Sequence, residues 1–128
     1  MRSPSAPMRV LVVDDETTVA DSLGEILALH GFEVIVCYDP ALAIIAGQKL
    51  KPQVLISDVV MPSMSGFQLA GHYTLHHPQC HVLLVSGNAT APSLGRQAEA
   101  SGPLPCYLEK PVHPSMILGF VNSCAAPV

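Results

Sequence analysis

Five polar residues that could do chemistry stand at or just after the ends of short apolar runs: Asp14, Asp15, Asp58, Ser86 and Lys110. Short, valine-rich runs of this kind are typical of strands that are buried on both faces. The carboxyl ends of parallel strands meet at one edge of a sheet, and open α/β sheets bind their ligands at that edge. We therefore expect the five side chains to gather into one site.

The residue types in this set indicate phosphoryl chemistry. Three carboxylates repel one another unless a cation shares them or some stay protonated. Hard oxygen ligands suit Mg²⁺, which binds through one or two carboxylates together with waters and phosphate oxygens. A lysine and a hydroxyl could hold phosphoryl oxygens while a carboxylate acts as the nucleophile. Taken singly, an Asp after a strand is more often a helix cap, but five such residues at strand ends favour a site.

The elements that must position these residues alternate along the chain. Apolar runs predict strands over residues 8–13, 32–36, 54–57, 82–85 and 106–108. Apolar spacing and capping residues predict helices between them, from Thr17 or Thr18 to His30, then over residues 39–50, 67–77, 91–102 and 114–124. This alternation predicts a parallel sheet with helices on both faces.

Composition excludes several classes of protein. The 128 residues include 6 Lys+Arg and 10 Asp+Glu, and only 12% are charged. That balance excludes a charge-driven nucleic-acid binder, while 49% hydrophobic residues argue against disorder. No apolar run is long enough for a membrane span, and the polar start, residues 1–7, does not have the form of a signal peptide. Four cysteines without a CxxC pair are interpreted as small fillers in a reducing compartment, so we expect a cytoplasmic protein.

Four stretches of the sequence resemble the response-regulator receiver domain of two-component signalling. They are VLVVDDE (10–16), VLISDVVMPSMSGFQL (54–69), VLLVSGNA (82–89) and YLEKPV (107–112). The resemblance implies a flavodoxin-like, doubly wound α/β fold with a five-stranded parallel sheet of order 2-1-3-4-5 and five flanking helices. It implies one receiver domain over residues 8–125, after a flexible tail at residues 1–7.

The resemblance also assigns roles to individual residues. Asp58 would accept a phosphoryl group from a histidine kinase or a phosphotransfer protein, and Lys110 would contact that group. Mg²⁺ would be held by Asp15, Asp58 and the backbone carbonyl of Val60, and by Asp14 through a water.

A second set of implied roles concerns the response to phosphorylation. Ser86 would bring its hydroxyl onto the phosphoryl group and Tyr107 would follow it inward, as the family's switch pair. The bond from Lys110 to Pro111 would be a cis peptide, which is energetically accessible only before proline.

Two regions depart from the pattern of the family. Prolines and glycines crowd residues 90–106, so we expect a short or displaced helix there. The final helix carries no Asp, Glu, Lys or Arg, so we expect a monomer or a weak apolar dimer rather than a salt-bridged one. An unidentified downstream protein would dock by apolar and polar contacts. Four histidines between residues 72 and 81 are interpreted as a solvated helix end rather than a metal site.

Three functions remain distinguishable at this point. The first is a phosphate-accepting switch that turns over no separate substrate. The second is a phosphate-independent pseudo-receiver that serves only as an interaction module. The third is a Mg²⁺-dependent phosphatase or phosphotransferase, and the short chain argues against it because such enzymes need a cap to enclose a substrate.

Overall fold

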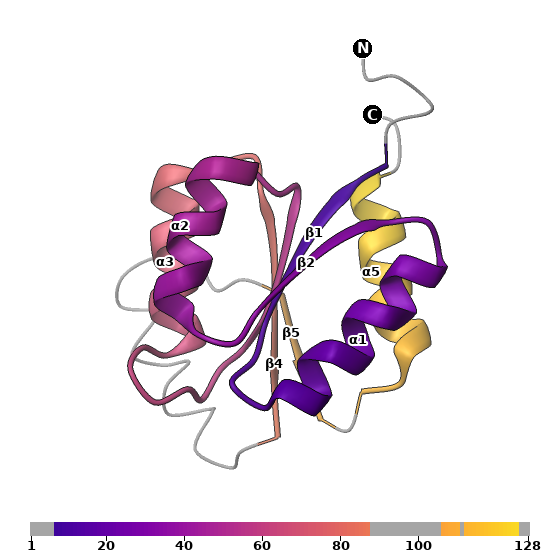
Figure 1. Cartoon of the computed structure of the whole chain (residues 1–128), viewed down its shortest axis with the longest axis horizontal. Coiled ribbons are helices and arrows are strands. Elements are labelled where there is room, and N and C mark those ends of the chain that lie inside the picture. Colours follow the sequence, from indigo (N-terminus) through magenta and orange to yellow (C-terminus); the bar gives the residue numbers. More distant parts are fainter. Residues whose placement is uncertain (1–6, 88–105, 111, 126–128) are drawn as a thin grey trace.

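A five-stranded parallel sheet lies at the centre of the molecule, with helices on both faces (Figure 1). The computed structural model describes residues 7–87, 106–110 and 112–125. In that part the elements are β1 (Arg9–Val13), α1 (Thr17–Leu29), β2 (Glu33–Cys37), α2 (Pro40–Leu50), β3 (Val54–Asp58), α3 (Gly66–His76), β4 (His81–Ser86), β5 (Cys106–Glu109) and α5 (Pro114–Ala125).

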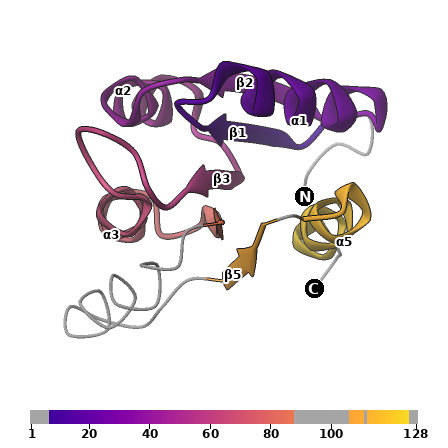
Figure 2. The same cartoon turned by 90° about the horizontal axis from the view of Figure 1, so that it is seen from below.

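The strand order is β2-β1-β3-β4-β5, and every neighbouring pair is parallel. This confirms the predicted fold class and strand order. Four of the expected flanking helices are described, while the helix expected over residues 91–102 lies outside the described residues. Helices α1 and α5 cover one face, and α2 and α3 cover the other (Figure 2). All five strands therefore present their carboxyl ends at the same edge.

Successive strand residues enter different cores, because side chains alternate across a strand. Val10 and Val12 of β1 pack on the α1–α5 side with Val121 of α5. Leu11 and Val13 pack on the α2–α3 side with other buried side chains, among them Tyr73 of α3. Burial on both faces explains why β1 reads as a continuous apolar run.

The start of α1 differs from the prediction. The helix begins at Thr17, and Glu16 is the residue before it, so neither Thr17 nor Thr18 is the N-cap. The Asp14 carboxylate accepts a hydrogen bond from the Glu16 backbone N–H at 2.9 Å. The Glu16 side chain accepts no capping hydrogen bond, so α1 begins without a side-chain N-cap.

Other predicted boundaries agree with the structure. Asp39 caps α2 by accepting a hydrogen bond from the Ala41 N–H at 2.7 Å, with Pro40 as the first helical residue. Gly31, just after α1, has a φ of +91°, the left-handed region in which glycine is favoured.

The histidines at the end of α3 are only partly solvated. His76 is exposed, but His72 and His77 are partly buried. The His72 and His76 rings lie 4.3 Å apart, and His77 packs against Tyr73 at 4.8 Å. The interpretation as a solvated helix end is therefore wrong for His77, whose buried Nε2 would lie 3.1 Å from a Cβ on Gly47 of α2. It is incomplete for His72, whose Nε2 is also buried. Burial, followed by repulsion from its two neighbours, lowers the pKa of His72.

Within the described residues, none of the helices has the length and apolar character that crossing a bilayer requires.

Candidate functional site

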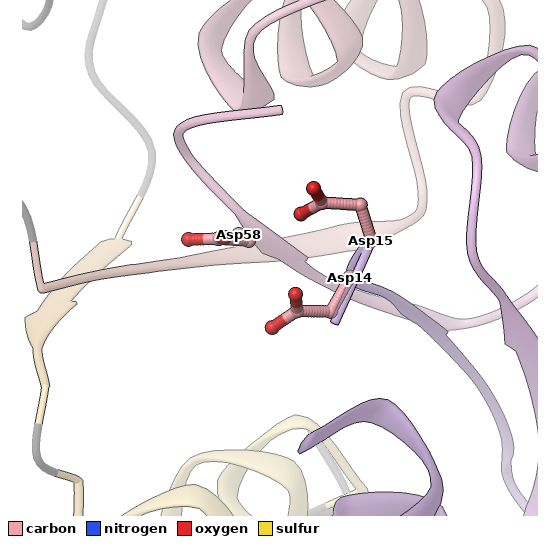
Figure 3. A group of neighbouring side chains, drawn as sticks. All are labelled: Asp14, Asp15 and Asp58. Atoms are coloured by element: carbon pink, nitrogen blue, oxygen red, sulfur yellow. The ribbon is translucent and has the colours of Figure 1, made fainter. Parts of the chain in front are cut away.

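Three aspartates meet at the carboxyl edge of the two central strands. Asp14 and Asp15 follow β1, and Asp58 ends β3. The register pairs Val13 with Ser57, so the residues that follow them emerge side by side. One carboxylate oxygen from each aspartate lies within 4.8 Å of the others. Figure 3 shows Asp14 and Asp15 pointing to opposite sides of their strand end, with Asp58 beside them.

Backbone amides hold two of the three carboxylates in place. Asp14, only 5% exposed, accepts the hydrogen bond from Glu16 described above. The Oδ1 atom of Asp58 accepts a hydrogen bond from the Val59 N–H at 2.9 Å. Asp15 is exposed at the rim. Two fixed acceptors and one solvent-facing carboxylate thus form the acidic part of the site.

Lys110 brings a positive charge into the same place. Its Nζ lies 3.3 Å from Asp14 Oδ2 and 3.7 Å from Asp58 Oδ1. Its backbone N–H donates to the carbonyl oxygen of Ser86 at 2.8 Å, just past the paired ends of β4 and β5. The sheet therefore positions Lys110 and Ser86 together.

The charges in this site are imperfectly balanced. Burial, and then the nearby Asp14 carboxylate, raise the pKa of Asp58, although Lys110 acts in the opposite direction. Burial would lower the pKa of Lys110, but the attraction of Asp14 and Asp58 outweighs it and the pKa is raised. Lys110 is thus firmly protonated, and the carboxylates still carry excess negative charge.

A hollow of about 500 Å³ opens beside these residues, and we call it the polar hollow. It is lined by Asp15, Glu16, Asp58, Val60, Ser86, Gly87 and Lys110. Five residues singled out from the sequence therefore border one space. Asp14 does not line the polar hollow, but its carboxylate forms an ion pair with Lys110, which does. Tyr107, on β5, is 37% exposed and does not line the polar hollow. Pro111, and with it the expected cis peptide, lies outside the described residues.

Glu16 follows the two aspartates in the sequence and joins the wall of the polar hollow. One contributor to the site was missed by sequence reasoning. Gly66 begins α3 so close to β3 that a Cβ on it would lie 2.3 Å from the Asp58 carbonyl oxygen. A readable signal precedes Gly66, because Ser65 and Gln68 form a reciprocal capping box and the S-x-x-Q pattern marks a helix start.

The donor set fits a magnesium ion. The available ligands are carboxylate oxygens, which Mg²⁺ prefers and which leave positions for water. Burial, and then the Asp14 carboxylate, raise the pKa of Asp58, and a dication among the carboxylates would act in the opposite direction. An acidic triad of this kind is typical of the Mg²⁺-binding site of receivers.

The fold and the site define an α/β module with a place for a cation and an anion at one sheet edge. The sequence model of the response regulator receiver domain family matches residues 10–122. The chain therefore belongs to this family of two-component signalling proteins. Receiver domains are signalling modules rather than catalytic enzymes, and they interact with histidine kinases.

Curated proteins are similar to this chain, some over nearly their whole length and others over a part of it. Protein PilH of Pseudomonas aeruginosa is 29% identical over 122 residues, which cover 92% of this chain and 98% of PilH. An uncharacterised 14.6 kDa protein of Leptolyngbya boryana is 34% identical over 118 residues, 91% of this chain and 89% of that protein. The probable transcriptional regulatory protein TcrX of Mycobacterium tuberculosis is 33% identical over 85 residues, which span 66% of this chain but only 36% of TcrX.

Solved structures share the fold. Chemotaxis protein CheY4 of Vibrio cholerae superposes with a TM-score of 0.80 at 26% identity, covering 93% of this chain and 99% of that one. A CheY-like receiver domain protein of Methanospirillum hungatei gives 0.82 at 24% identity, covering 92% and 93%, which supports the fold alone.

Proposed function

We propose that this protein is a phosphate-accepting switch in which Asp58 takes a phosphoryl group from a histidine kinase or a phosphotransfer protein. The observation that carries the proposal is the position of the Asp58 carboxylate, 3.7 Å from Lys110 Nζ and beside two further aspartates. A nucleophile and a fixed cation next to it are what phosphoryl transfer requires, because the reaction depends on positioning and charge neutralisation.

In this proposal the phosphoryl step uses Asp58 as a nucleophile. A carboxylate oxygen of Asp58 forms a bond to phosphorus, and the phosphorus–nitrogen bond of the phosphohistidine donor breaks. The imidazole leaves carrying the proton on its other ring nitrogen. Lys110 holds an oxygen of the transferred group and neutralises part of its charge. The Val59 N–H keeps the Asp58 side chain oriented.

Mg²⁺ is the implied cofactor of this step. Asp15, Asp58 and the backbone carbonyl of Val60 would hold it directly, and Asp14 would hold it through a water. When bound, the ion would supply positive charge to the oxygens of the transferring group.

The proposed switch consists of Ser86 and Tyr107. Ser86 is buried at the end of β4 and lines the polar hollow, within the space that a phosphoryl group on Asp58 would enter. Tyr107 lies on the adjacent strand, paired with Leu84, and its ring is partly exposed. Phosphorylation would bias an equilibrium between two arrangements of this pair and so change which proteins bind.

We further propose a single receiver domain over residues 8–125 with a tail at 1–7, a cytoplasmic location and output through a protein partner rather than direct nucleic-acid binding. Four free cysteines suit a reducing compartment. The uncharged last helix supports a monomer or a weak apolar dimer.

Intact mass spectrometry after incubation with acetyl phosphate and Mg²⁺ tests the proposal. We expect one added phosphoryl group on the wild-type protein and none on Asp58→Asn, or on wild type with Mg²⁺ chelated. A protein that is folded, binds Mg²⁺ and gains no phosphoryl group would instead be the phosphate-independent interaction module.

A further inference from the structure

Two histidines near the end of α3 have the spacing of a metal chelate. His72 and His76 lie four residues apart on the helix, so their side chains project from the same face. Their ring centroids are 4.3 Å apart, and the ring planes meet at 39°. Paired histidines at this helical spacing are a known way for proteins to hold zinc through one ring nitrogen each.

One ring nitrogen of His72 lacks a hydrogen-bond partner. Its Nε2 atom is buried and has no such partner among the described residues. A buried polar atom of this kind costs free energy unless another group satisfies it. Burial, and then repulsion by His76 and His77, lowers the pKa of His72. The imidazole is therefore neutral at pH 7, which is the form that binds metals.

His77 belongs to a different contact. Its ring centroid lies 6.4 Å from that of His72, and its Nε2 faces Gly47 of α2. Among the described residues, three ligand atoms come together only at the three aspartates. A metal at the end of α3 would therefore have two protein ligands. Since His76 is exposed, its ring can turn toward the ion, and water can take the remaining positions.

The chemistry of the pair favours a transition metal over Mg²⁺. Imidazole nitrogen suits Zn²⁺, whereas Mg²⁺ prefers oxygen ligands. The helix begins beside Asp58 and ends shortly before β4 begins, at the opposite edge of the sheet (Figure 1). The pair is therefore separate from the aspartate site.

The residue after His72 indicates binding rather than hydrolysis. Zinc hydrolases with this histidine spacing carry a glutamate directly after the first histidine, as a general base. In this chain the position is Tyr73, which is buried and donates its hydroxyl to the Ala43 carbonyl oxygen at 2.6 Å. The role of that glutamate has no counterpart at this position.

We propose that His72 and His76 form a zinc site on α3, with water completing the coordination. The ion would accept a lone pair from each ring and link two successive turns at the end of the helix. This site is independent of phosphoryl transfer to Asp58.

Nuclear magnetic resonance of protein with ¹⁵N-labelled histidine tests the proposal, because the ring nitrogens of each imidazole are followed separately. We expect zinc chloride, added in the presence of excess Mg²⁺, to shift the ring resonances of His72 and His76. Those of His30 and His113, which are exposed on other elements, should stay in place.

A matched pair of variants tests whether the two imidazoles act together. In His76→Gln, the zinc concentration that half-shifts the His72 resonances should rise at least about tenfold, since even the hydrogen-bond partners of metal ligands commonly contribute that much to affinity. His76 is exposed, so this variant keeps the fold. His30→Gln, which removes an exposed histidine at the end of α1, should leave that concentration unchanged.

Two results would overturn the inference. The first is that the His72 and His76 resonances do not move with zinc, as would happen if only cysteine or aspartate side chains bound it. The second is an equal half-shifting concentration in wild type and His76→Gln. Both results leave the proposed function intact, because phosphorylation of Asp58 is followed separately by intact mass. Zinc shifts without phosphorylation would support the zinc site and overturn the proposed function alone.

Discussion

The Asp58 carboxylate lies between like charges and one opposite charge, and this environment decides how it can react. Burial, and then Asp14 and Asp15, raise its pKa, while Lys110 and the Val59 N–H lower it. Burial makes each of these interactions stronger than it would be in water. The chemistry assigned to the site therefore depends on a few named side chains, whose substitution has predictable signs.

Replacing Lys110 by Met should slow phosphorylation of Asp58 by about 100-fold or more, the usual effect of deleting one charge-stabilising donor from an active site. The rate of adduct formation with acetyl phosphate measures the change. Lys49→Met, at an exposed position on α2, is the matched control and should keep the wild-type rate. Equal rates for Lys110→Met and wild type would remove Lys110 from the proposed mechanism.

Without Mg²⁺, the contribution of Asp58 to the stability of the protein should fall as the pH rises through the carboxyl range. Asp58 has a folded-state pKa above its ordinary value of 3.8, so between the two values the folded protein binds more protons than the unfolded chain. Asp58→Asn removes this loss. Thermal melts should show the variant more stable than wild type at pH 7, with the difference shrinking as the pH falls toward 3.8. A difference in stability that does not depend on pH would show that folding does not raise the pKa of Asp58.

Val60 should influence how long the phosphoryl group persists. Its side chain is 41% exposed on the wall of the polar hollow and cannot orient an attacking water by hydrogen bonding. We expect the wild-type adduct to outlast seconds in Mg²⁺, and Val60→Asn, whose amide can hold a water, to lose it several-fold faster. The decay of the adduct mass after donor removal measures both lifetimes, and Val60→Leu, which adds no polar group, should decay as wild type does.

At the scale of elements, the site depends on how closely α3 begins beside β3. The Gly66 N–H donates to the Val59 carbonyl oxygen at 2.7 Å, and its missing side chain leaves room for the Asp58 backbone. The helix start thus positions the strand end that carries the proposed nucleophile.

Gly66→Ala should destabilise the protein by about 1–3 kcal/mol, the usual cost of an overpacked contact, and should slow phosphorylation by displacing Asp58. Chemical denaturation and adduct formation measure the two effects. Gly71→Ala in the same helix is the control, because its Cβ would meet nothing within 4 Å and alanine favours helix by about 1 kcal/mol. Equal stability of the two variants would show that the close approach of α3 is unimportant.

The sequence predicted strands and their ends better than helix starts. Buried strands have apolar runs that end at a polar residue, as at Asp58, so their position can be read directly. The start of α1 was misplaced because Glu16, which is not a typical capping residue, precedes the helix and makes no side-chain cap. Close contacts such as that of Gly66 follow from how elements pack, which one sequence does not display. The hollow of about 690 Å³ between α1, α5 and the sheet could not be predicted either, because it depends on how these helices pack on the sheet.

At the scale of the whole molecule, charge is concentrated at the site. The net charge of the chain is −4. Four acidic residues line the polar hollow or lie next to it: Asp14, Asp15, Glu16 and Asp58. No charged residue follows Lys110 in the sequence. The surface of α5 therefore offers apolar and neutral groups to a partner, including Met116, which is 51% exposed.

Self-association should respond to salt in the direction expected for apolar contacts. Any dimer should persist or strengthen in high concentrations of sulfate, whereas one held by surface ion pairs would weaken as salt screens them. Sedimentation velocity at low and high salt, with and without a phosphoryl group on the protein, measures this. A dimer that dissociates as salt rises would contradict the expectation.

The most direct test of the central claim is to locate the acquired phosphoryl group. After phosphorylation, borohydride reduces an aspartyl phosphate to homoserine, and peptide mapping then identifies the modified position. We expect homoserine at residue 58 in wild type and unmodified peptides throughout in Asp58→Asn. Modification at another carboxylate in wild type, or no modification of a folded and Mg²⁺-supplied protein, would contradict it.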